Sequence, residues 1–120
     1  MTIRERKNMP AVSKPAQADH SMISDQFEIY HVDKDVQADM PLHYHDFYEI
    51  NCVLNGTGVF CLDGDEYETT PGTVTLVNIN DLHNIVRQSS SYYERAYIYV
   101  TKAYLTAHST AATDLTACFR

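Results

Sequence analysis

The fold is decided by the stretch His43-Tyr44-His45-Asp46-Phe47-Tyr48-Glu49. It places two imidazoles and a carboxylate within seven residues, and it continues into a strand-like run that ends at Asn55-Gly56. A third imidazole, that of His83, follows another strand-like unit further along the chain. Three imidazoles and one carboxylate can hold a divalent transition metal, or they can form the polar lining of a small-ligand pocket.

The spacing of these residues sets a geometric condition on any shared site. His43 and His45 are two residues apart, so on a strand both face the same side, about 6.6 Å apart along its axis. Glu49 shares their parity, but a straight strand would carry it roughly 13 Å beyond His45. A zinc-bound carboxylate oxygen lies only about 2.0–2.2 Å from the ion. A shared site therefore requires the chain to bend near Asp46-Phe47, with His83 supplied by a separate strand.

The rest of the chain alternates short β-rich runs with turn signals, which is typical of an antiparallel sandwich or barrel. Strands are predicted over 27–32, 42–54, 59–62, 66–69, 73–78, 83–87 and 94–101. Asn55-Gly56-Thr57-Gly58 is a hairpin signal, and Asp63-Gly64 and Pro71-Gly72 are further turns. Weak helical character follows in 102–108 and in 113–119, where Thr113 or Asp114 is the expected N-cap. The predicted fold class is all-β, an antiparallel barrel with short C-terminal helices.

Composition excludes several functions. A formal net charge of −7 argues against this chain contacting nucleic acid itself, because phosphate binding needs clustered Lys and Arg. Cys52, Cys61 and Cys118 lack C-x-x-C spacing and are expected to be reduced thiols. No apolar run reaches the ~18 residues of a membrane span, and the N-terminus has no signal-peptide core. We therefore expect a cytoplasmic protein that does not associate with membranes.

The chain divides into three parts. Residues 1–24 are polar and aperiodic, which predicts a flexible N-terminal arm. An arm that folds over the ligand or pairs at a sheet edge is the alternative. Residues 25–101 are assigned to the barrel, and 102–120 to the start of a C-terminal helical segment that stops without a cap, as if the chain were cut there.

The residues around His43 resemble the first motif of the cupin superfamily, which reads His-x-His, three or four residues, Glu, six residues, Gly. His43, His45, Glu49 and Gly56 fit it, although its leading glycine would fall at Gln37. The second motif is half present, because Gly72 and His83 fit while its proline, glycine and asparagine are replaced by Asn78, Asn80 and Arg87. The resemblance implies a cupin, jelly-roll-like barrel.

A closer resemblance covers about residues 25–119 and is to the N-terminal sensing domain of AraC-type transcription regulators. It is carried by Leu42-His43-Tyr44-His45, Tyr48-Glu49-Ile50, Leu54-Asn55-Gly56, Pro71-Gly72, Val77-Asn78, His83, Tyr93-Glu94-Arg95, Asp114-Leu115 and Cys118-Phe119. In that family this domain binds a small effector, often a sugar, inside the barrel and contributes to dimerisation. A C-terminal helix-turn-helix domain, which this chain does not contain, binds DNA.

The leading hypothesis is a non-enzymatic effector-binding domain that dimerises, with His43, His45, Tyr48, Glu49 and His83 as its ligand-binding residues. Tyr44, Tyr97 and Tyr99 are further candidates, because a tyrosine ring packs on the C–H face of a sugar while its hydroxyl hydrogen-bonds.

The metal question stays open at this point. His43, His45, Glu49 and His83 are candidate ligands for Zn, Ni, Mn or Fe. A small metal-dependent cupin enzyme, such as a dioxygenase or isomerase, is the alternative hypothesis, in which the ion acts as a Lewis acid.

Overall fold

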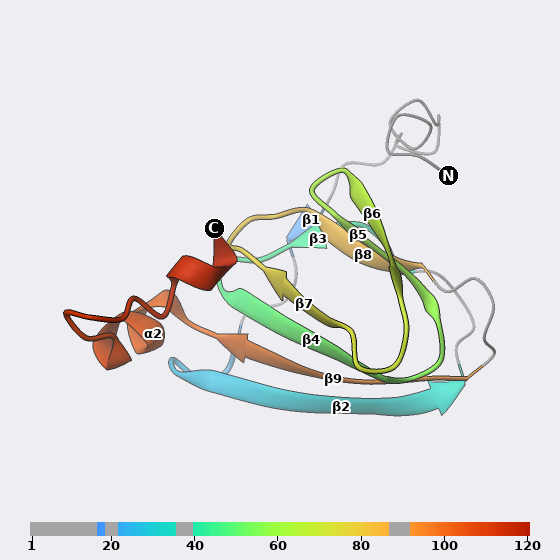
Figure 1. The fold of residues 1–120 in the computed structure, drawn as a ribbon, viewed down its shortest axis with the longest axis horizontal. Helices are drawn as coiled ribbons and strands as arrows, with labels where there is room; N and C mark the ends of the chain where they lie inside the picture. Colours follow the sequence, from blue (N-terminus) through green and yellow to red (C-terminus); the bar gives the residue numbers. More distant parts are fainter. Residues whose placement is uncertain (1–16, 19–21, 36–39, 87–91) are drawn as a thin grey trace.

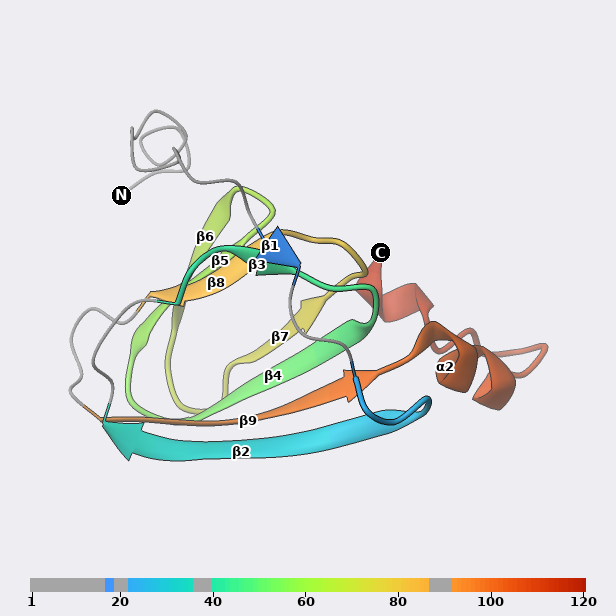
Figure 2. The ribbon, with the colours of Figure 1, turned by 180° about the vertical axis from the view of Figure 1, so that it is seen from behind.

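The structure is a computed structural model that describes residues 17–18, 22–35, 40–86 and 92–120. In this part of the chain two β-sheets face each other, with strand orders β1-β3-β8-β5-β6 and β2-β9-β4-β7 (Figures 1 and 2). The strands are β1 (Gln17–Ala18), β2 (Phe27–Asp35), β3 (His43–Tyr44), β4 (Tyr48–Asn55), β5 (Gly58–Leu62), β6 (Asp65–Thr69), β7 (Val74–Val77), β8 (His83–Val86) and β9 (Tyr92–Val100). The predicted all-β fold is confirmed.

The hairpin predicted at Asn55-Gly56-Thr57-Gly58 is wrong. The strand before it, β4, pairs with β7 and β9, whereas the strand after it, β5, pairs with β6 and β8 in the opposite sheet. Gly56 does supply the left-handed turn, with φ of 88°. The turn therefore carries the chain from one sheet to the other rather than back along the same sheet.

The two other predicted turns lie where expected. Asp63 and Gly64 have φ of 49° and 91° and join β5 to β6 as a two-residue hairpin, because Leu62 pairs directly with Asp65. Positive φ at both central residues is the type I′ geometry, whose twist matches that of the flanking strands. Gly72 has φ of 96° after Pro71, and the Thr73 amide donates to the Thr70 carbonyl, 2.9 Å away, which closes the second turn.

The interior between the sheets follows from strand alternation. Inward positions of both sheets contribute one buried apolar cluster, made of Val53, Phe60, Val77, Ile85 and Tyr93. Met40 and Leu62 pack against it. Burial of apolar area in this cluster stabilises the fold by about 25 cal/mol per Å². Other inward positions of β4 and β9 carry buried polar side chains, those of Glu49, Asn51 and Arg95.

The C-terminal segment lies at one end of the β2-β9-β4-β7 sheet (Figures 1 and 2), where Phe119 is buried with Tyr48 and Val100. The predicted helix over 102–108 is confirmed as α2 (Lys102–His108), and the Thr101 hydroxyl caps it by accepting from the Tyr104 amide. The second predicted helix is shorter than expected: only Ala117–Phe119 forms a 3-10 turn, η2. Neither Thr113 nor Asp114 is its N-cap: that position is Thr116, whose side chain makes no capping hydrogen bond.

Most of the predicted N-terminal arm lies outside the described residues. Within it, Gln17–Ala18 forms β1 and pairs in parallel with β3, which is the one parallel pairing among the described strands. The three cysteines, Cys52, Cys61 and Cys118, are thiols in the structure. No helix in the described part of the chain is long and apolar enough to cross a membrane.

Candidate functional site

The stretch predicted as one strand over 42–54 is two strands in different sheets. β3 ends at Tyr44, the chain bends at Asp46-Phe47, and β4 begins at Tyr48. The turn residue Asn80, which has φ of 65°, donates its amide to the His45 carbonyl, 2.9 Å away, and so fixes the backbone at the bend. The bend that the spacing required for a shared site is therefore present.

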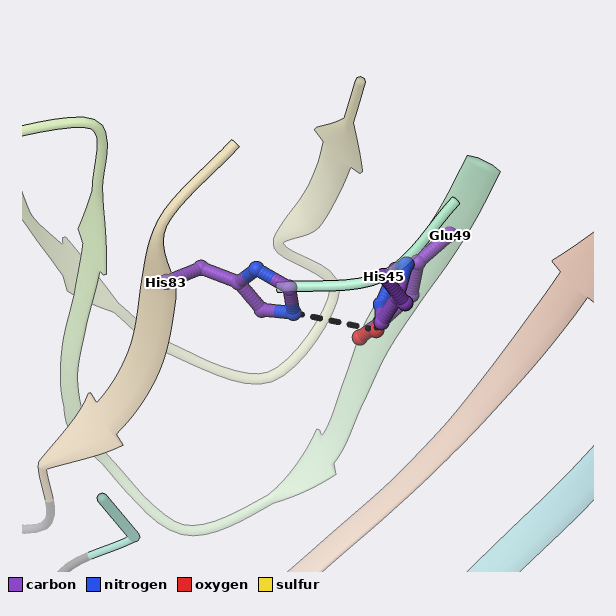
Figure 3. A group of neighbouring side chains, drawn as sticks. All are labelled: His45, Glu49 and His83. Carbon is purple, nitrogen blue, oxygen red and sulfur yellow. Dashed lines mark hydrogen bonds and ion pairs between the residues drawn. The ribbon is translucent and has the colours of Figure 1, made fainter. Parts of the chain in front are cut away.

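Three polar side chains converge where the bend faces β8. The His45 Nε2 lies 3.0 Å from the Glu49 Oε1, and the His83 Nε2 lies 3.4 Å from the same oxygen (Figure 3). The residues are 4%, 3% and 2% exposed for His45, Glu49 and His83 respectively. The imidazole of His45, at the bend, and that of His83, on β8, thus share one carboxylate oxygen of Glu49, on β4. All three side chains are shielded from bulk water.

Each imidazole is oriented by its other nitrogen. The His45 Nδ1 lies 2.9 Å from the Phe47 carbonyl oxygen, and the His83 Nδ1 lies 2.8 Å from the Asp81 carbonyl oxygen. A carbonyl oxygen can only accept, so both Nδ1 atoms carry the proton and donate it. In a neutral imidazole the Nε2 then has a lone pair and no proton. Both Nε2 atoms nevertheless face a carboxylate oxygen, so the contacts are favourable only if the imidazoles gain protons or a cation lies between them.

Glu49 is held in its charged form. Burial opposes the charge and by itself raises the pKa of Glu49, but hydrogen bonds from His45 and His83, together with their charges, outweigh burial. The pKa of Glu49 falls from its ordinary value of 4.5 to about 2. The Glu49 carboxylate is therefore ionised at any physiological pH.

The donor set fits a divalent transition metal. Ligand atoms of His45, Glu49 and His83 all lie within 4.8 Å of one another. Atoms that each bind an ion at about 2.0–2.2 Å lie roughly 3–3.5 Å apart, which is the separation of both imidazole nitrogens from Glu49. Carbonyl groups that orient ligand imidazoles through Nδ1 are the usual outer support of such sites. These three residues would hold the ion and leave a further coordination position open.

Two of the predicted residues are outside the three-residue group. His43 is not part of the three-residue group: its Nδ1 lies 2.9 Å from the Pro41 carbonyl oxygen, and its ring packs on His83 with centroids 4.2 Å apart. Tyr48 lies on the opposite face of β4 from Glu49, where its ring stacks on Phe119 with centroids 4.3 Å apart. The structure therefore places Tyr48 in the outer core rather than in the site, because neighbouring residues of a strand face opposite sides.

Aromatic rings of β9 continue the site along the inner face of the sheet. The Tyr99 centroid lies 5.3 Å from that of His45 and 5.2 Å from that of Tyr97. Phe47, which the sequence did not single out, stacks on His45 with centroids 4.1 Å apart. Of the four candidate tyrosines, Tyr97 and Tyr99 thus face the interior, and strand alternation puts Tyr44 on the face opposite His43.

Two polar residues of the inner face were missed by the sequence analysis. Asn51 and Arg95 are both buried, and the Arg95 Nη1 donates to the Asn51 Oδ1 over 3.0 Å. The two-residue period of a strand could have identified both residues as inward-facing. Asn51 follows Glu49 by two positions, and Arg95 precedes Tyr97 by two.

Comparison with solved structures defines the class of fold. A cupin protein from Bacteroides fragilis superposes with a TM-score of 0.61 at 24% identity, over 74% of this chain and 75% of that one. An RmlC-like cupin from Methanocaldococcus jannaschii gives 0.58 at 20% identity, over 65% and 72% of the two chains. The DMSP lyase DddQ from Ruegeria pomeroyi DSS-3 gives 0.57 at 21% identity, over 66% and 40%. The fold is the cupin double-stranded β-helix.

Comparison of sequences then gives the family. The family described as the AraC-like ligand binding domain matches residues 26–117, so the chain belongs to that family. The HTH-type transcriptional activators RhaS of Shigella sonnei (strain Ss046) and Escherichia coli (strain K12 / DH10B) are each 49% identical over 47 residues. The match spans 39% of this chain and 17% of the length of each relative.

Proposed function

We propose that this chain is the effector-sensing part of a transcription regulator and that a small molecule binds between its sheets, at His45, Glu49 and His83. The observation that carries the proposal is the convergence of these buried ionisable side chains in a member of a ligand-binding family. Burying ionisable groups destabilises the fold, and proteins keep such groups mainly at functional sites. RhaS, the matching relative, is a transcriptional activator.

A carbohydrate is the effector class that best suits the surrounding residues. Tyr97 and Tyr99 offer ring faces on which the C–H groups of a sugar can pack. The Glu49 carboxylate accepts hydrogen bonds from sugar hydroxyls, and the two imidazoles can also accept or donate depending on their protonation. Binding can signal only if the ligand prefers one of two arrangements of the domain, so we expect it to shift an existing equilibrium.

The test is calorimetric titration with a panel of neutral sugars and small organic acids, combined with alanine variants. His45→Ala and His83→Ala should each weaken binding of any responding compound by about tenfold or more, since a hydrogen bond to a charged group is removed. His108→Ala, an exposed histidine on α2, is the matched control and should bind as the wild type does. If both site variants bind every responding compound normally, the site lies elsewhere.

We also propose that two copies associate and that DNA is contacted by another part of a longer, cytoplasmic protein. The acidic net charge of −7 supports the second point. Light scattering coupled to size exclusion should give the mass of a dimer. In a gel-shift experiment at physiological salt, this chain alone should not retard duplex DNA, and retardation would contradict the assignment.

A metal-dependent cupin enzyme is the second candidate, and the donor set of His45, Glu49 and His83 is the observation that favours it. When bound, the ion would supply a Lewis acid with an open coordination position. Elemental analysis of protein purified without a nickel column tests this candidate. Stoichiometric Fe, Mn, Ni or Zn that disappears in His83→Ala would support it, and metal-free wild type would remove it.

A further inference from the structure

Arg95 is a buried cation without an acidic partner in the described part of the chain. It is 9% exposed, it projects from the inner face of β9, and its guanidinium carbon lies 4.3 Å from the centre of the Tyr97 ring. The ion pairs among the described residues are His31–Glu94, His45–Glu49, His83–Glu49 and Arg120–Asp114, and none of them includes Arg95. Burying a charge without an opposite charge is strongly unfavourable.

Asn51 presents a second unmatched donor beside it. This residue is 0% exposed, and its Oδ1 accepts from Arg95 over 3.0 Å. Its Nδ2 has no hydrogen-bond partner among the described residues. A guanidinium has five N–H groups and no acceptor. The pair therefore has a positive charge and N–H groups without acceptors, while its one acceptor, the Asn51 Oδ1, already binds Arg95. This combination is complementary to an anion.

The Arg95–Asn51 pair lies next to the proposed effector site. β4 and β9 are paired neighbours (Figure 1), with Asn51 opposite Tyr97 and Glu49 opposite Tyr99. Asn51 is thus one inward step, about 6.6 Å, from Glu49 along the same strand. The Tyr97 ring, which faces the Arg95 guanidinium, lies next to the Tyr99 ring, with centroids 5.2 Å apart. The Tyr99 ring in turn lies next to the His45 ring, with centroids 5.3 Å apart.

We propose that Arg95 and Asn51 form a carboxylate-binding subsite, so that the effector is a sugar acid or similar hydroxylated carboxylic acid. Its carboxylate binds Arg95 and Asn51, its body packs on Tyr97 and Tyr99, and its hydroxyl groups reach His45, Glu49 and His83. The inference rests on the proposed effector-binding function. A single negative charge suits the site better than a dianionic phosphate, because the ionised Glu49 lies close by and repels added charge.

Matched ligands that differ only in the acidic group test the subsite. The probes are galactose and galacturonate, glucose and glucuronate, and glucose 6-phosphate, titrated calorimetrically at constant ionic strength. At least one acid should bind the wild type on the order of tenfold or more tightly than its neutral partner, the range expected for a charge-assisted hydrogen bond. Arg95→Met should abolish this preference, and Arg95→Lys should restore part of it.

Further variants separate binding from folding. Arg120→Met removes an exposed arginine that pairs with Asp114 and should leave the preference intact. Asn51→Leu should weaken the acid more than the neutral sugar, and if Arg95→Met fails to fold, Asn51→Leu and Arg95→Lys still report on the subsite. Equal binding of acid and neutral sugar to the wild type would overturn the subsite while leaving effector binding in place. Tighter binding of glucose 6-phosphate would overturn the carboxylate assignment, and no binding by any probe would overturn the subsite and the effector proposal together.

Discussion

Glu49→Gln tests the electrostatics of the site most directly, because it keeps the side-chain volume and removes the charge that both imidazoles face. The pKa of Glu49 is about 2, against an ordinary value of 4.5. At about 1.4 kcal/mol per pKa unit, this difference stabilises the folded state by about 3 kcal/mol at neutral pH.

The sign of the pH dependence follows from the direction of the shift. The folded pKa lies below the ordinary value, so the stabilisation is fully present above pH 4.5 and is lost as the pH falls toward 2. The difference in unfolding free energy between wild type and Glu49→Gln should therefore shrink by about 2.5 kcal/mol between pH 6 and pH 2.5.

Urea unfolding followed by circular dichroism over this pH range measures that difference. Glu68→Gln is the matched control, because Glu68 is an exposed carboxylate on β6, and its profile should run parallel to that of the wild type. A Glu49→Gln profile that also stays parallel to the wild type, within about 0.5 kcal/mol, would refute the reasoning, because Glu49 would then not be held ionised by the two histidines.

Three further predictions concern the scaffold, and each is measured by urea unfolding. Phe119→Ala should cost about 3 kcal/mol because it removes a buried ring that stacks on Tyr48. Because this ring lies outside the site, the variant should weaken calorimetric binding of the sugar panel much less than His45→Ala does; a loss of binding as complete as that of His45→Ala would contradict this placement. Thr101→Ala should cost about 1 kcal/mol by uncapping α2, whereas Ser at this position should cost less. Gly64→Ala should destabilise by about 1 kcal/mol at φ of 91°, and a stabilised variant would show that the turn is not type I′.

Part of the site could be predicted from the sequence. Strand parity is a local property, so the spacing placed His43, His45 and Glu49 on one face and set the condition that a shared site needs a bend near Asp46-Phe47. The bend itself was not predicted, because 42–54 was assigned as one strand. Which of the two neighbouring histidines contacts Glu49 could not be predicted. That choice depends on where β3 ends: His43 is still in the strand, and His45 lies past it at the bend, where the Asn80 amide fixes the backbone.

The errors have separate physical causes. Tyr48 was named as a ligand-binding residue for its ring and hydroxyl, although strand alternation puts it on the face of β4 opposite Glu49. The Asn55-Gly56 turn was identified correctly, but a turn signal does not say which strand the chain pairs with next. That partner is set by closure of the whole barrel, in which β5 pairs with β6 and β8. Arg95 entered the sequence analysis only as part of the motif that carries the family resemblance. Its burial was not predicted, because it depends on how both sheets pack.

β4 connects the two faces of the molecule that matter for the proposed function. Its inward residues Glu49 and Asn51 belong to the site and the subsite, while its outward residue Tyr48 stacks on Phe119 in the C-terminal segment. Adjacent residues of one strand are joined by rigid peptide units. In the proposed sensing, a ligand that shifts the backbone of β4 at Glu49 would also move Tyr48 and so change its packing on Phe119. In this proposal the signal has a short path, because the strand that would bind the ligand also packs directly against the C-terminal segment.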